Sequence, residues 1–124
     1  MAKINLIIEK GEDGKLWGRV YFRNNLMTDF ASTVELLEKK MSRLIKDFYG
    51  VDAVFDHTYD VSAFFESFDF LNQTRIADLS GINPGLLRQY ASGVKHPSPQ
   101  QTKKIESAIH KLAQELKAVS LHAA

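Results

Sequence analysis

The side chains best suited to recognising a ligand lie near the middle of the helical C-terminal half. Arg88 can donate two hydrogen bonds to O6 and N7 of guanine, and Gln89 can pair with N7 and N6 of adenine. Neither side chain can do this unless a rigid element holds it in a groove of DNA. The chemistry therefore depends on the helices that carry these two residues.

The segment from Asn72 to Gly93 predicts two short helices joined by a tight turn. Ala77 is a small residue where the helices would cross, and Gly81 ends the first helix where a positive φ is expected. Asn83 can cap the second helix, and Pro84 fits its first position because a missing N–H costs nothing there. Such a helix-turn-helix places its second helix in the major groove of DNA.

The charge distribution also favours a nucleic-acid partner. The 124-residue chain has a net charge of +1, yet residues 1–71 carry 9 Lys/Arg and 12 Asp/Glu, whereas residues 72–124 carry 7 and 3. Neutralising phosphates supplies most non-specific affinity for DNA, so a basic excess is expected beside the predicted helix-turn-helix. The excess is modest for one chain and would double in a dimer.

Composition limits the class of protein. The chain is 44% hydrophobic and 25% charged, as in a globular domain. No apolar run approaches the roughly 20 residues of a membrane span, and Glu9, Glu12 and Asp13 interrupt the pattern of a secretion signal. The absence of cysteine excludes disulfides and thiolate zinc sites. We expect a cytoplasmic protein with no membrane partner.

The N-terminal half predicts a small α+β module. Residues 4–8 and 16–22 are predicted strands around the turn Glu12-Asp13-Gly14, and residues 26–31 and 51–59 are two further strands. Ser32-Thr33-Val34-Glu35 forms a capping box that opens a helix. We expect a small antiparallel sheet with this one helix packed on it.

The C-terminal half predicts only helices. Ser62 is the expected cap of a helix carrying Phe64, Phe65, Phe68 and Leu71. Ser98-Pro99-Gln100-Gln101 is a second capping box and opens a long helix after the helix-turn-helix. The change of pattern divides the chain into an α+β module over residues 1–61 and a helix-turn-helix domain over residues 62–124.

The helical half resembles the DNA-binding domains of the lambda and 434 repressors and Cro. The likeness rests on Gln73, Ala77, Gly81, Ile82, Leu87, Tyr90, Gly93, Pro97 and Ile105. It implies an all-α lambda-repressor-like domain whose base-contacting residues are Gln73, Pro84, Gly85, Arg88 and Gln89.

Contacts to phosphate are expected from residues around this motif. They are Asn72, Ser92, Lys95, His96, Lys103 and the adjacent Lys104, and the alternative for each charge is a solvated surface position. Pro84 and Gly85 stand where those repressors often have polar base-reading residues. Because neither side chain can hydrogen-bond, backbone contacts and DNA shape should contribute more to recognition.

The order of elements along the whole chain resembles the HicB family of antitoxins. The matching segments are Ile4–Glu9, the turn Glu12-Asp13-Gly14, Leu16–Val20 and Ser32–Leu36. The resemblance implies a partial ribonuclease-H-like module that binds a small ribonuclease toxin, HicA. It also implies a C-terminal domain that binds operator DNA, represses its own operon and forms a homodimer or higher homo-oligomer.

The chain departs from that family after the second strand. Arg23–Asp29 stands where HicB proteins have a Pro-x-x-Pro-Gly-like segment. A HicB-like regulator with no toxin partner is therefore an alternative to the antitoxin.

Catalysis is not expected. Asp52, Asp56 and Asp60 recur every fourth residue. On a strand they would spread over about 25 Å, at roughly 3.3 Å per residue, and so cannot share one Mg²⁺. The histidines show no metal-binding spacing, and no cofactor is implied.

A second hypothesis is a protein-interaction module without DNA binding. Trp17, Arg19 and Tyr21 share one face of a predicted strand. If the helix packs on the opposite face, these three residues form a surface for a partner chain; otherwise the helix covers them.

Overall fold

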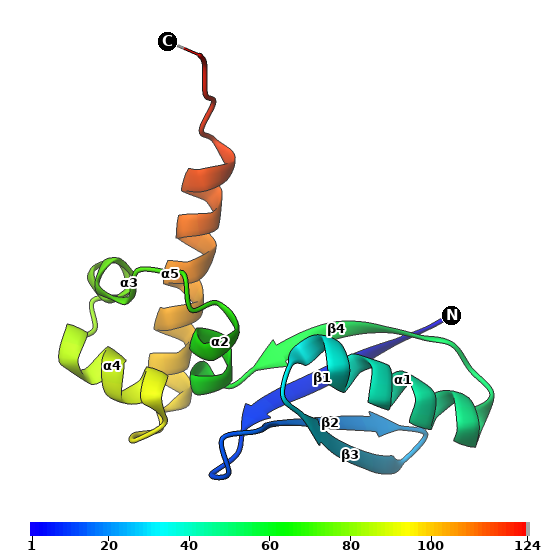
Figure 1. Cartoon of the computed structure of the whole chain (residues 1–124). Coiled ribbons are helices and arrows are strands. Elements are labelled where there is room, and N and C mark those ends of the chain that lie inside the picture. The colour runs from blue at the N-terminus through cyan, green and yellow to red at the C-terminus, as the bar shows by residue number, and fades with distance from the viewer. Residues whose placement is uncertain (124) are drawn as a thin grey trace. The chain divides into compact units, whose positions relative to one another are not determined.

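The chain forms an α+β structure in which helices are interleaved with strands (Figure 1). The computed structural model describes residues 1–123. The elements are β1 (Ala2–Lys10), β2 (Leu16–Phe22), β3 (Asn25–Ala31), α1 (Val34–Tyr49), β4 (Ala53–Tyr59), α2 (Val61–Ser67), α3 (Gln73–Ser80), α4 (Pro84–Ser92) and α5 (Pro99–Lys117). They group into two compact units, Met1–Asp69 and the chain from Phe70 onward. Helix α2, expected in the second domain, thus groups with the first unit.

The sheet of the first unit is mixed, so the prediction of an antiparallel sheet was wrong. Its order is β3-β2-β1-β4, with β2 antiparallel to both β1 and β3. Strand β4 pairs in parallel with β1, from Ala2 opposite Ala53 to Ile8 opposite Tyr59. The reason is α1, a crossover helix that returns the chain to the end of the sheet from which β1 starts.

Two tight turns connect the first three strands. Gly14 has a φ of +78°, and the Asp13 carboxylate accepts a hydrogen bond from the backbone N–H of Lys15 at 3.0 Å. That bond holds the pKa of Asp13 below its ordinary value. Arg23 and Asn24 both have positive φ, as a two-residue hairpin turn requires. The strand predicted over residues 26–31 is present as β3, which follows this turn.

Helix α1 covers one face of this sheet (Figure 1). Its cap is Thr33 rather than the predicted Ser32, because Thr33 has extended dihedral angles and its Oγ1 accepts from the N–H of Leu36. The buried side of α1 carries Leu37, Met41 and Ile45, which pack in one core with β1 and β2. Helix α1 lies close to β2 at Gly18, where an added Cβ atom would lie 2.9 Å from the Leu37 side chain.

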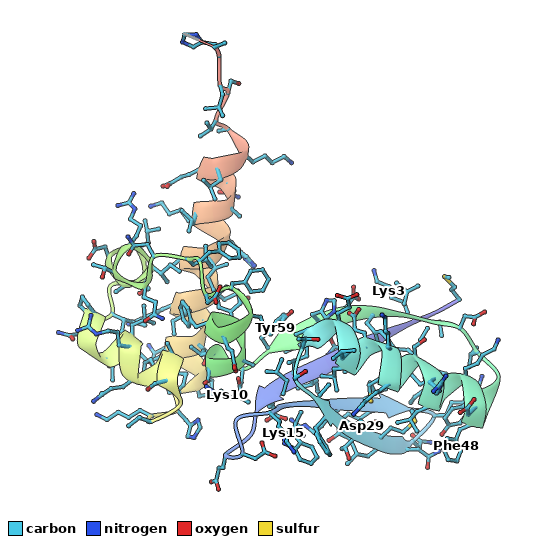
Figure 2. The ribbon with its side chains drawn as sticks, viewed as in Figure 1. Lys3, Lys10, Lys15, Asp29, Phe48 and Tyr59 are labelled. Carbon is cyan, nitrogen blue, oxygen red and sulfur yellow. The ribbon has the colours of Figure 1, made fainter. Side chains whose placement is uncertain are left out.

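Helix α2 begins two residues earlier than predicted. Its cap is Asp60, whose carboxylate accepts from the N–H of Ala63 at 2.7 Å, whereas the predicted cap, Ser62, is buried inside the helix. The rings of Phe64 and Phe68 stack on each other, and the Tyr59 ring contacts both of them edge to face. Tyr59 and Lys10 lie at the same end of the sheet (Figure 2), and burial raises the pKa of Tyr59.

The contact between Gly18 and Leu37 leads to a prediction for stability. We expect Gly18→Ala to lower the free energy of unfolding by about 1–3 kcal/mol, because the added methyl group collides with the Leu37 side chain. Leu37→Ala alone should cost about 2–5 kcal/mol through the cavity that it leaves. In that background Gly18→Ala should cost little. Urea unfolding of the four proteins measures the coupling, and equal costs of Gly18→Ala in both backgrounds would contradict it.

Candidate functional site

The two predicted helices and the tight turn between them are present as α3 and α4. Gly81 ends α3 with a φ of +73°, and its N–H donates to the carbonyl of Ala77. Asn72 caps α3 by accepting from the N–H of Arg75 at 3.0 Å. Asn83 caps α4 by accepting from the N–H groups of Gly85 and Leu86, at 2.8 and 3.3 Å. Each end of the turn is therefore fixed by its own hydrogen bonds.

A small core holds α3, α4 and α5 together. The buried residues of this core are Ile76, Ala77, Ile82, Leu87, Tyr90, Ile105 and Ala108. Tyr90 is only 7% exposed, so its ring is part of the core and cannot stack on a base. With Leu87 and Tyr90 buried, the rotation of α4 about its own axis is fixed, and its opposite side faces solvent.

The predicted base-contacting residues of α4 share that solvent side. Helical spacing brings Pro84, Gly85, Arg88 and Gln89 together, opposite the buried Leu87. Arg88 and Gln89 are exposed, and their side chains make no hydrogen bond or ion pair with any described residue. A Cβ atom at Gly85 would lie 3.8 Å from Nη2 of Arg88, so this guanidinium extends over the first turn of α4. Gln73, the remaining predicted base contact, is the half-buried first residue of α3.

The predicted phosphate contacts divide into three groups. Asn72 and Ser92 have structural hydrogen bonds, since Asn72 caps α3 and the Ser92 hydroxyl donates to the carbonyl of Gln89 at 3.1 Å. Lys95 and His96 lie exposed in the loop after α4, and the N–H of Lys95 bonds back to Gln89. Lys103 is exposed on α5.

Lys103 and Lys104 face a depression of about 360 Å³ between α3 and α5. Leu79, Ser80, Gln100 and Ser107 line it with them. Sequence reasoning used Gln100 only as part of a capping box, and no pattern in the sequence indicated that its side chain would join the two lysines. The depression is a basic, polar surface of the kind that phosphate groups contact.

Trp17, Arg19 and Tyr21 lie on the sheet face opposite α1. Arg19 pairs with Glu9 at 2.6 Å and donates to the Tyr21 hydroxyl at 3.4 Å. The Trp17 ring lies 4.8 Å from that of Phe30 on β3. Tyr21 is 60% exposed. Because α1 packs against the other face, the alternative in which this helix covers the three residues is wrong.

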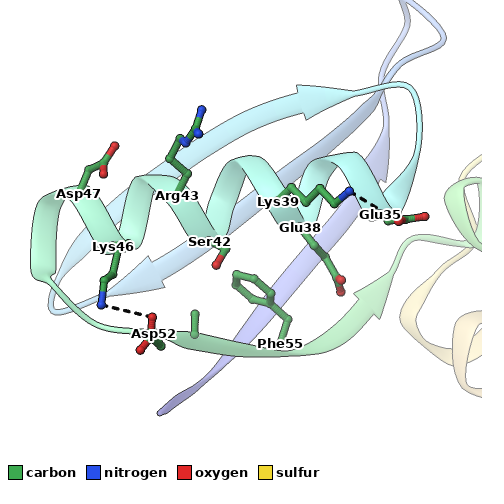
Figure 3. Close-up of a pocket in the computed structure, with 10 residues that line it drawn as sticks. Glu35, Glu38, Lys39, Ser42, Arg43, Lys46, Asp47, Asp52 and Phe55 are labelled. Atoms are coloured by element: carbon green, nitrogen blue, oxygen red, sulfur yellow. Dashed lines mark ion pairs between the residues drawn. The ribbon is translucent and has the colours of Figure 1, made fainter.

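A second depression, of about 550 Å³, lies between α1 and β4 (Figure 3). Its charged residues largely neutralise one another: Lys39 pairs with Glu35, and Lys46 pairs with Asp52 at 3.3 Å. At the same edge, Glu38 on α1 contacts the His57 ring on β4. An internally paired surface of this kind presents little net charge to a ligand.

The three regularly spaced aspartates are engaged separately. Asp52 pairs with Lys46, Asp56 pairs with Lys3, and Asp60 caps α2. Within residues 1–123 no three His, Asp or Glu side chains are grouped as a metal site would require. None of the helices in that range is long and apolar enough to cross a membrane.

Comparisons with protein-family models, with curated proteins and with solved structures gave no match to this chain.

The two hydrogen bonds to Asn83 lead to a prediction for the second unit. Asn83→Ala should lower its free energy of unfolding by about 1 kcal/mol, because the first N–H groups of α4 lose their acceptor. Asn83→Ser should retain most of the stability, since a hydroxyl can also cap the helix. Thermal unfolding followed by circular dichroism compares them, and an Ala variant as stable as the Ser variant would contradict this role.

Proposed function

We propose that the chain is a sequence-specific DNA-binding transcription regulator that inserts α4 into the major groove. One observation carries the proposal. The side chains of Arg88 and Gln89 are exposed and have no partner among the described residues, on the side of α4 opposite its buried residues, and capped helix ends fix the orientation of that side. In this proposal the second unit is a lambda-repressor-like domain, and duplex operator DNA is its ligand.

Each residue of this surface has a separate role. Arg88 donates to O6 and N7 of guanine, and Gln89 pairs with adenine. Pro84 and Gly85 carry no polar side-chain atoms and let the backbone of the first turn approach the bases closely. Gln73 contacts DNA from the start of α3. Only two side chains on α4 are then capable of base-specific hydrogen bonds, so DNA shape supplies part of the specificity.

Phosphate contacts come from the basic residues around α4. Lys95 and His96 extend from the loop that follows this helix, and Lys103 and Lys104 extend from α5. Asn72 and Ser92 contribute from the ends of α3 and α4. These contacts give affinity and fix the position of the protein on the duplex without reading sequence.

The wider role we propose is that of a cytoplasmic HicB-like antitoxin that represses its own operon as a homodimer. The exposed sheet face around Trp17, Arg19 and Tyr21 is the surface proposed for a HicA-like ribonuclease toxin. A HicB-like regulator without a toxin is the alternative that the departure at Arg23–Asp29 favours. No cofactor is needed for either role.

A protein-interaction module without DNA binding is the second candidate function. The observation that favours it is the same sheet face, with Tyr21 and the neighbouring Leu26 more than half exposed. Exposed aromatic side chains are common at the centres of protein interfaces. DNA binding distinguishes this candidate from the regulator.

Selection of bound sequences from a random duplex pool tests the proposal. We expect the chain to enrich a two-fold-symmetric site whose half-sites lie about 34 Å apart, one helical turn of DNA. Arg88→Ala should reduce discrimination at one base pair of each half-site by about 1–3 kcal/mol, which is roughly 5–150-fold. Gln89→Ala should act on a neighbouring base pair.

Lys111→Ala is the matched control. It also removes one exposed positive charge from the second unit, on α5. If Lys111→Ala and Arg88→Ala change the selected sequences equally, α4 is not the reading helix. If no sequence is enriched and no duplex is bound, the proposal fails and the interaction module takes its place.

The lysines in the proposed phosphate contacts should show a different signature. Lys95→Ala should weaken binding to all duplexes alike, because a phosphate contact carries no sequence information. The plot of log affinity against log salt concentration should become shallower by about 1. Fluorescence anisotropy across a salt series measures this slope, and an unchanged slope would remove Lys95 from the interface.

A further inference from the structure

The two halves of α5 differ in what they contact. In the first half, Ile105 and Ala108 are only 2% exposed, in the core shared with α3 and α4. In the second half, Ile109 and Leu112 are half-buried and Leu116 is 62% exposed. Figure 1 shows the C-terminal half of α5 extending away from α3 and α4. The apolar side of the helix therefore continues beyond the elements that cover it.

Helical spacing gathers these residues into one stripe, which we call the α5 stripe. It consists of Ile109, Leu112, Ala113 and Leu116. A partly exposed stripe of large aliphatic side chains on a regular helix is characteristic of an interaction surface. The question is which partner covers it.

The charges along one edge of the α5 stripe favour a second copy of this helix as the partner. Glu106 and Lys117 both lie on the edge that also carries Ala113, one near each end of the stripe. Both are exposed, and neither forms an ion pair with any described residue. A helix with opposite charges at the two ends of one edge is complementary to an antiparallel copy of itself. In a parallel two-fold pair, Glu106 of one copy and Lys117 of the other would lie at opposite ends of the contact and on opposite sides of it, so these ion pairs could not form.

We propose that the α5 stripe is the contact of a homodimer in which two copies of α5 pack antiparallel. With the two-fold axis between Leu112 and Ala113, Ile109 of one copy faces Leu116 of the other. Glu106 of each copy then lies beside Lys117 of the other, giving two symmetric ion pairs. Ala113, small and exposed, lets the two helices approach closely at the axis.

The size of this contact sets the expected strength of the dimer. A stable interface buries about 800 Å² on each partner, and one side of half a helix offers less. The dimer is therefore reversible, with a dissociation constant on the order of micromolar. It supplies the homodimer of the proposed regulator but rests only on the surface of α5, so it is tested without DNA.

Sedimentation equilibrium of the full chain over a range of concentrations tests the proposal. We expect a monomer–dimer equilibrium that Leu116→Lys shifts at least 10-fold toward monomer. Gln114→Lys is the matched control, since it places the same side chain on the opposite, solvent side of α5 and should leave the equilibrium unchanged. Both positions are exposed, so both variants should fold, and circular dichroism checks this.

Charge reversal tests the antiparallel arrangement itself. Glu106→Lys alone and Lys117→Glu alone should each weaken the dimer several-fold, because like charges then meet in both symmetric pairs. The double variant should recover the wild-type equilibrium, since opposite charges face each other again. The proposal is overturned if the wild-type chain stays monomeric at about 100 μM, well above a micromolar dissociation constant. It is also overturned if Leu116→Lys has no effect, or if the double variant is no better than the single ones.

Discussion

The burial of one side of α4 is the constraint on which the rest of the second unit depends. Leu87 and Tyr90 enter a core shared with α3 and α5, and this leaves the side with Arg88 and Gln89 in solvent. The left-handed Gly81 and the cap at Asn83 fix where α4 starts. None of these features contacts a ligand, yet together they determine which side chains of α4 are exposed to solvent.

In the first unit the constraint is the crossover helix α1. This helix covers one face of the sheet and leaves the other face uncovered. Helix α1 packs on the side of β2 that carries Leu16, Gly18 and Val20, so the alternating residues Trp17, Arg19 and Tyr21 must face the other way. The Arg19–Glu9 pair and the contact between Trp17 and Phe30 order that face. The unit thus combines a packed layer with an ordered, uncovered sheet face.

Local signals predicted the elements well, and long-range pairing was predicted poorly. The Asp-Gly turn, Gly81 and the caps Asn83 and Ser98 act within a few residues, so the sequence alone located the ends of these helices and this hairpin. The caps at Thr33 and Asp60 were missed because polar residues one or two positions away compete for the same role, and only the backbone angles decide between them. The parallel pairing of β4 with β1 was missed because alternation reveals a strand but not its direction. Among the site residues, the resemblance to the repressors implied the set on α4 that shares one side, whereas the grouping of Gln100 with Lys103 depended on how α5 packs against α3.

The central claim is that the exposed side of α4 is the surface that meets DNA. Titrating a short duplex into the ¹⁵N-labelled full chain and following the backbone amide signals tests it most directly. The account predicts that the largest shifts occur at the starts of α3 and α4, around Gln73 and from Asn83 to Gln89, and in the loop with Lys95. Shifts centred on the sheet of the first unit, or no shifts at a duplex concentration of about 1 mM, well above typical non-specific dissociation constants, would contradict it.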